Sequence, residues 1–159
     1  MHLENSIPGS YSVVNVQTLG REFLQLIETT DMQKVYKMPI LYGFYNEGDV
    51  RLAVTDAEVV ESWKKFFDRG TNWKDFPKVT SYEEYRKITD KQHLSKAKSM
   101  PIKFLKASGK GFFIDKDGYA LGIRDELVDV IKVDAFKKQM KDIIEHRTME
   151  YYRRRYVEN

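Results

Sequence analysis

Residues 90–121 read DKQHLSKAKSMPIKFLKASGKGFFIDKDGYAL. The start of this stretch predicts a helix that begins near Asp90 and buries Leu94 and Ala97 on its inner face. Pro101 lacks an amide donor, so we expect it to end that helix and to open a second one. The stretch therefore predicts two short helices that meet at a turn.

A β-hairpin is expected directly after the second helix, which we place at residues 101–107. The Asp117-Gly118 dipeptide lies between two β-prone runs and is a strong short-range hairpin signal. The strands are predicted at residues 112–114 and 119–121. Helix, turn, helix and hairpin follow one another in the order of a winged helix. We therefore expect a winged-helix-like unit over about residues 90–123.

The remainder of the chain predicts more helices. Thr55-Asp-Ala-Glu58 reads as a capping box ahead of an apolar stripe, and Arg69-Gly70 is typical of the end of that helix. Apolar periodicity and capping residues predict further helices over about 18–29 and 39–45, after Ser81, near 125–131 and from Asp134 onward. The expected fold class is mainly α with one β-hairpin, a helical domain containing a winged-helix-like unit.

The length of 159 residues and the hydrophobic fraction of 42% fit one domain with a single core. We expect residues 17–159 to form that domain. Residues 1–16 lack helical periodicity and contain Pro8-Gly9-Ser10, so they predict a tether. The absence of cysteine excludes a disulfide scaffold, and the absence of a long apolar run or a signal peptide predicts a cytoplasmic protein with no membrane contact.

The charge of the chain is unevenly distributed. The formal net charge is only +3, yet residues 86–110 hold eight basic side chains and one acid, Asp90. Lysines on a short helix and beside a hairpin suit contact with nucleic-acid phosphates. The candidate nucleic-acid contacts are Lys96, Lys98, Lys103, Lys106, Lys110, Lys116, Arg147, Arg153, Arg154 and Arg155. For each lysine, a merely solvated surface position is the simpler alternative.

The arginines at the C-terminal end alternate with tyrosines, which suits phosphate contact beside base stacking. The same arginines can also complement the dipole of a helix end, and both interpretations stay open.

Two other classes of function deserve comparison. Aromatic side chains favour interface cores, so Tyr42, Tyr45, Trp73 and Phe76 are candidates for a protein-docking surface. A metal-dependent nuclease is the third possibility, but the acidic residues fall on predicted helices and the histidines lack metal-ligand spacing. No glycine-rich phosphate loop precedes Lys110-Gly111. We expect no catalytic residue, no metal and no cofactor in this chain.

Several segments resemble the extreme C-terminal region of large bacterial DEAD/DEAH-box helicases, which are superfamily II proteins related to restriction and defence systems. The resemblance rests on residues 26–41 (LIETTDMQKVYKMPIL), 72–74 (NWK), 100–105 (MPIKFL), 111–113 (GFF) and 135–156 (AFKKQMKDIIEHRTMEYYRRRY). It covers about residues 20–156 and includes no motor motif.

This resemblance implies a non-catalytic accessory domain that binds nucleic acid, DNA rather than RNA, next to a helicase core. The ATPase would lie elsewhere in the parent protein, because this chain has no phosphate-binding loop, no DEAH-like box and no arginine finger.

Overall fold

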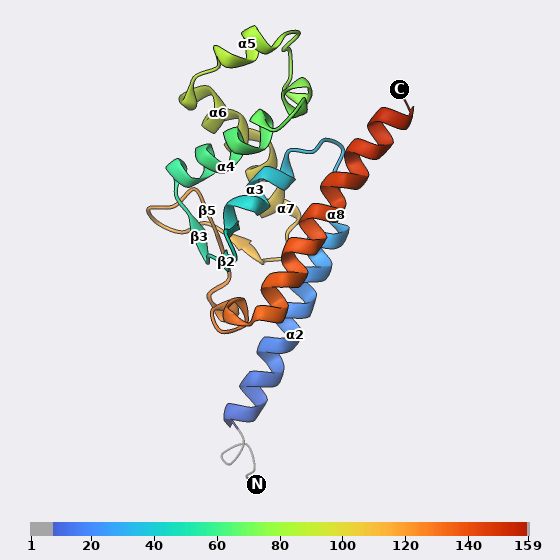
Figure 1. Ribbon diagram of the computed structural model, residues 1–159. Helices are drawn as coiled ribbons and strands as arrows, with labels where there is room; N and C mark the ends of the chain where they lie inside the picture. The colour runs from blue at the N-terminus through green and yellow to red at the C-terminus, as the bar shows by residue number, and fades with distance from the viewer. Residues whose placement is uncertain (1–7, 159) are drawn as a thin grey trace.

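The computed structural model describes the backbone of residues 8–158 and the side chains of residues 17–155. Two long helices, α2 (Pro8–Thr29) and α8 (Asp134–Glu158), lie side by side and run in the same direction (Figure 1). Phe23 of α2 stacks on Phe136 of α8 with their ring centroids 6.2 Å apart. This helix pair forms one wall of the fold.

The start of α2 differs from the prediction. Residues 8–16 were expected in the tether but belong to the helix, whereas residues 1–7 of the tether lie outside the described residues. A proline fits the first helical position, because its missing amide would have no helical partner there and its fixed φ suits a helix. Pro8 thus opens a helix instead of breaking one.

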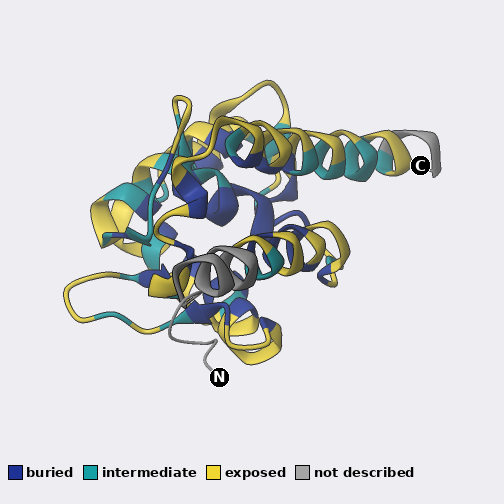
Figure 2. Ribbon diagram, turned by 90° about the horizontal axis from the view of Figure 1, so that it is seen from below, coloured by how far each residue is buried: buried dark blue, intermediate teal, exposed yellow. Residues whose placement is uncertain are grey.

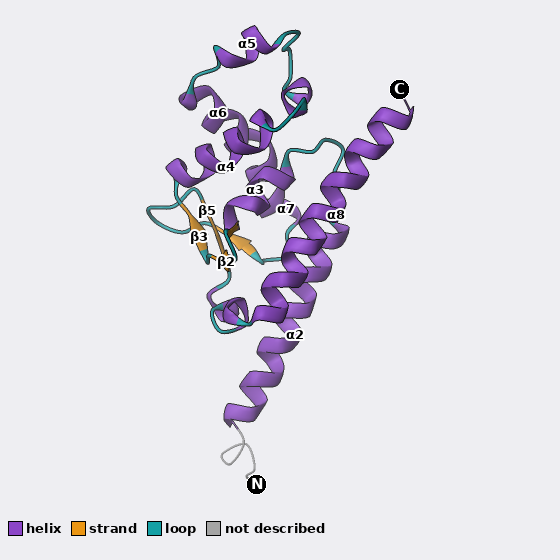
Figure 3. Cartoon of the chain, in the orientation of Figure 1, coloured by secondary structure: helices purple, strands orange, loops and turns teal. Residues whose placement is uncertain are grey.

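The other helical segments are short, and Figure 3 shows how far helix outweighs strand. They are α3 (Lys37–Phe44), α4 (Asp56–Asp68), η1 (Asn72–Asp75), α5 (Tyr82–Arg86), α6 (Asp90–Ala97), η2 (Lys98–Ile102), α7 (Lys103–Ser108), η3 (Asp125–Leu127) and η4 (Val130–Lys132). The segments η1, η3 and η4 are 3₁₀ turns, and η2 is a π-helical turn. The prediction of a mainly helical fold is confirmed.

Helix α4 forms as its sequence predicts. The amide of Thr55 donates to Glu58 Oε1 at 2.9 Å, and the amide of Glu58 donates to Thr55 Oγ1 at 3.1 Å. These reciprocal bonds satisfy amides that the first helical turn leaves free. The apolar stripe behind them buries Trp63 completely, with Tyr36 and Phe67 at ring-centroid distances of 5.9 and 5.0 Å.

A small hairpin follows α3 where only the end of a helix was expected. Strands β1 (Tyr45–Asn46) and β2 (Asp49–Val50) pair antiparallel across the Glu47-Gly48 turn. Both turn residues have positive φ, 50° and 90°, which is the backbone that a two-residue hairpin requires. Gly48 adopts that backbone without a steric penalty.

The predicted hairpin over residues 112–121 is part of a three-stranded antiparallel sheet. Its strands β3 (Ala53–Val54), β4 (Phe113–Ile114) and β5 (Leu121–Ile123) are arranged in the order β3-β5-β4. The β-turn around Asp117-Gly118 closes when the amide of Tyr119 donates to the carbonyl of Lys116 at 3.0 Å. The hairpin prediction is confirmed, β5 starts two residues later than expected, and β3 was not predicted.

Buried residues gather where the helices meet each other and the sheet, as Figure 2 shows by colour. Phe23 is fully buried and lies 5.6 Å, ring to ring, from both Phe112 and Phe113 next to and within strand β4. The hairpin is therefore held against α2 by aromatic packing, and the helix that precedes the hairpin is fixed with it.

The inner face of α6 was predicted from Leu94 and Ala97. Ala97 is buried, but His93 is buried in place of Leu94, which is only partly covered. The His93 ring lies 5.3 Å from the Phe76 ring and 5.7 Å from the Tyr85 ring. Among the described residues, Nδ1 of His93 finds no hydrogen-bond partner. An imidazole thus sits in an aromatic core.

Burial, reinforced by Lys64, lowers the pKa of His93 below its ordinary 6.5. The unfolded chain therefore takes up this proton before the folded chain does as the pH falls. We expect the free energy of unfolding to decrease between about pH 7 and pH 5, by at most about 1.4 kcal/mol per pH unit. Urea unfolding at several pH values should show that the free energy of unfolding decreases less in His93→Phe, which keeps the ring contacts. The control variant, His146→Gln at an exposed position, should show the same decrease as wild type. Equal pH dependence of wild type and His93→Phe would contradict this expectation.

Candidate nucleic-acid interface

The two predicted basic helices are one continuous helical rod, residues 90–108. Thr89 is the N-cap, one residue before the predicted start: its amide donates to Gln92 Oε1 at 2.9 Å, and the amide of Gln92 donates to Thr89 Oγ1 at 3.2 Å. The prediction that Pro101 breaks the helix is wrong. Pro101 lies inside the π-helical turn η2, where the wider hydrogen-bonding pattern accommodates its missing amide and α7 continues directly.

The C-terminal part of this rod has distinct inner and outer sides. Ile102 and Leu105 are buried, as their spacing predicts. Lys103, Phe104 and Ala107 are exposed on the opposite side, and we call these three residues the α7 face. Helical spacing places Lys103 and Phe104 on either side of Ala107, whose small side chain leaves room for a ligand to approach the helix.

The lysines of the rod and of the turn after it differ in their partners. Lys98 lies 3.0 Å from Asp56, and Lys106 lies 2.8 Å from Asp115. Both pairs are solvent-exposed, so each contributes about 0–1 kcal/mol and yields readily to a phosphate. Within the described part of the chain, Lys96, Lys103 and Lys110 form no ion pair. Of these three lysines, Lys103 and Lys110 are exposed to solvent.

Lys116, predicted as a contact on the hairpin, packs inward. Its side chain is only 18% exposed, and Nζ lies 2.7 Å from Asp125 Oδ1. The aliphatic part covers Gly122, where a Cβ atom would lie 2.5 Å from Lys116 Cδ. Lys116 therefore ties the hairpin loop to β5 and η3, and little of it remains for an outside ligand.

The predicted arginines lie on α8, which continues past the C-terminal end of α2 (Figure 1). Arg147 donates to the carbonyls of Ile27 and Thr30, at 3.1 and 2.6 Å, and so caps the C-terminal end of α2. Lys37 supports the same end by donating to Thr30 Oγ1 at 2.9 Å. Arg147 thus serves the structural role that the sequence left open.

Of the other three predicted arginines, one binds a buried carboxylate and two lie on the exposed side of α8. Arg155 lies 3.0 Å from the carboxylate of Asp75, whose side chain is 1% exposed. Arg153 and Arg154 both point to Glu150, at 3.0 and 3.9 Å, on the exposed side of α8. The ten predicted cations are therefore split between the rod with its hairpin and α8, and three of them, Lys116, Arg147 and Arg155, have structural roles.

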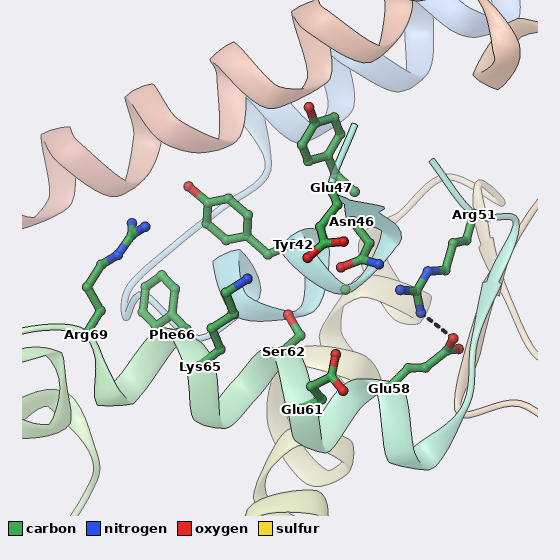
Figure 4. A pocket seen from close by; sticks show the side chains of 12 residues that line it. Tyr42, Asn46, Glu47, Arg51, Glu58, Glu61, Ser62, Lys65, Phe66 and Arg69 are labelled. Atoms are coloured by element: carbon green, nitrogen blue, oxygen red, sulfur yellow. Dashed lines mark ion pairs between the residues drawn. The ribbon is translucent and has the colours of Figure 1, made fainter. Parts of the chain in front are cut away.

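The predicted docking aromatics are also separated. Tyr42 and Tyr45 line one pocket of about 250 Å³ between α3, the β1–β2 hairpin and α4. Figure 4 shows Tyr42 and Phe66 there beside charged side chains, including the Arg51–Glu58 ion pair. Trp73 is half-buried on η1, away from that pocket. Phe76 is only 8% exposed and packs in the core, so it is not available to a partner.

Sequence reasoning missed one feature of the rod, the exposure of Phe104. Its side chain is 50% exposed, and it lines a cavity of about 320 Å³ between residues 31–37 and α7. The signal was present in the sequence, because a helix that buries Ile102 and Leu105 turns residue 104 away from the core.

No protein-family model, curated protein or solved structure matches this chain. Among the described residues, no helix is both long and apolar enough to cross a membrane. The same residues contain no group of three or more His, Asp or Glu side chains placed to hold a metal ion.

Proposed function

We propose that this chain is a winged-helix-type module that binds nucleic acid, DNA in the first place, through the phosphate backbone. The observation that carries the proposal is the order of elements α3, β3, α4, the α6–α7 rod, β4 and β5, with the last strand in the centre of the sheet. In a winged helix, the helix directly before the hairpin faces the nucleic acid. That position is occupied here by α7.

The charge of the rod supports this assignment. No acidic residue occurs in the sequence between Asp90 and Asp115, whereas six lysines do. Lys103, Lys106 and Lys110 lie on α7 or directly after it, where they can reach a phosphate backbone. Lysines recognise phosphates without reading bases, so we expect binding with little base specificity. The resemblance to helicase C-terminal regions is consistent with an accessory role beside a motor.

Fluorescence anisotropy with a labelled DNA tests the proposal through its salt dependence. Three phosphate contacts predict a log–log slope of about −2.7, because each contact contributes about 0.9. The affinity should therefore fall about 40-fold between about 50 and 200 mM salt. Absence of binding up to tens of micromolar protein, or binding that salt does not weaken, would overturn the proposal.

The pocket of Figure 4 favours a second candidate, a protein-docking module. It brings the half-buried rings of Tyr42 and Tyr45 beside Lys65 and Arg69, a mixture of aromatic and cationic groups that suits a protein interface. In this case charge reversal on α7 would leave the binding of the partner unchanged, and Tyr42→Ala would weaken it.

A further inference from the structure

Phe104 is a large apolar side chain held half in water. It lies on the α7 face next to Lys103, and 50% of its surface is exposed. Fully burying a phenylalanine stabilises a protein by about 1.5–3 kcal/mol. Because half of the Phe104 side chain is exposed, the isolated chain lacks part of this stabilisation. A ligand that covers the ring would recover it.

The ring borders a cavity with apolar walls. The cavity has a volume of about 320 Å³ and is lined by Met32, Met100 and Pro101 together with Phe104. This volume is at the lower end of the roughly 300–1,000 Å³ that small-molecule sites occupy. It suits one flat ring system, and it is too small for a folded protein segment.

Charge around the cavity favours an anionic ligand. Lys103 is exposed on the same helix face, and Lys34 lies at the rim of the cavity. Neither side chain has an ion-pair partner within the described part of the chain. Lys37, at the same end, donates to Thr30 and to the carbonyl of Asp31, and the exposed carboxylate of Asp31 is the acid at the rim.

An apolar ring flanked by cations matches one chemistry, an unpaired nucleotide whose base stacks on the ring while its phosphates meet the lysines. We propose that Phe104 stacks on an unpaired base and that this chain binds single-stranded nucleic acid more tightly than duplex. In a duplex the bases are already stacked on each other, so only an unpaired base can reach the ring. This inference rests on the proposed function.

The experiment compares labelled oligothymidine with a duplex of the same length, using the full chain. We expect wild type to favour the single strand, and Phe104→Ala to lower that affinity about tenfold while leaving the duplex affinity unchanged. Phe104→Trp should retain the preference. Tyr119→Ala is the matched control, because Tyr119 is 49% exposed at the hairpin turn but does not line the cavity.

The outcomes separate the two proposals. If neither nucleic acid binds, the proposed function itself is wrong and the inference falls with it. If both bind and Phe104→Ala weakens them equally or not at all, the stacking inference is overturned while phosphate binding stands. An equal loss of single-strand affinity in Tyr119→Ala would also overturn the inference.

Discussion

Arg155→Ala should lower the free energy of unfolding by about 3 kcal/mol, because it leaves a buried carboxylate without its cation. The guanidinium lies 3.0 Å from Asp75 Oδ1, and the Asp75 side chain is 1% exposed. The hydroxyl of Tyr151, 3.4 Å away, would be the remaining donor to that oxygen among the described residues. We place the effect at the low end of the range for buried pairs because Arg155 itself is 33% exposed.

The location of this pair enlarges its influence. The hydroxyl of Tyr36 donates to the backbone carbonyl of Asp75 at 2.7 Å, so η1 is bonded to the segment before α3 as well as to α8. Burial, together with the Asp75 carboxylate, raises the pKa of Tyr36 to about 12, so this hydroxyl keeps its proton at neutral pH. Arg155, which the sequence suggested as a phosphate contact, thus has a structural role in holding Asp75.

Urea unfolding measures the effect, and two further variants make it specific. Arg154→Ala should change the free energy of unfolding by less than about 0.5 kcal/mol, because Arg154 is 70% exposed and lies 3.9 Å from Glu150. Asp75→Asn combined with Arg155→Ala should recover part of the loss, because no uncompensated charge remains. Equal stability of Arg155→Ala and Arg154→Ala would show that the pair contributes nothing.

Reversing two charges, Lys103→Glu with Lys110→Glu, should weaken DNA binding about 100-fold at about 0.1 M salt. Each lost phosphate contact removes roughly one order of magnitude there, and each glutamate adds repulsion. Both lysines are exposed and make no ion pair with the described residues, so the fold should tolerate the change. Anisotropy measures the affinity, and circular dichroism verifies the fold.

Arg153→Glu with Arg154→Glu is the matched control, because it changes the net charge by the same amount on α8. We expect it to weaken binding far less than the lysine pair does. If the two double variants weaken binding equally, the attraction comes from overall charge, and α7 is not the site. If the lysine pair leaves binding unchanged in a folded protein, the docking module becomes the better description.

Local sequence patterns predicted the elements whose signals are local. The capping box at Thr55 and Glu58, the apolar stripe around Trp63 and the start of α8 each depend on residues three or four positions apart. The hairpin around Asp117-Gly118 likewise carries its own turn signal. These elements form as predicted because tertiary packing and local preference agree.

The features that the sequence did not predict depend on contacts between residues far apart in the chain. Arg147 caps a carbonyl 120 positions earlier, and β3 pairs with β5 although six helical segments separate the two strands in the sequence. Nothing near Arg147 or Ala53 in the sequence indicates those partners. The prediction at Pro101 was wrong for a different reason. A proline indicates that one backbone hydrogen bond is lost, but it does not indicate whether a wider helical turn will accommodate that loss.

The π-helical turn η2 also changes the direction, around the helix axis, in which the side chains after it point. In a regular α-helix, residues seven apart lie within about 20° of each other, so Lys96 and Lys103 would share a side. A π-helical turn takes in one extra residue and rotates the following segment back by about 100°. The two ammonium groups diverge, and a strand that touches both has to wind around the rod instead of running along it.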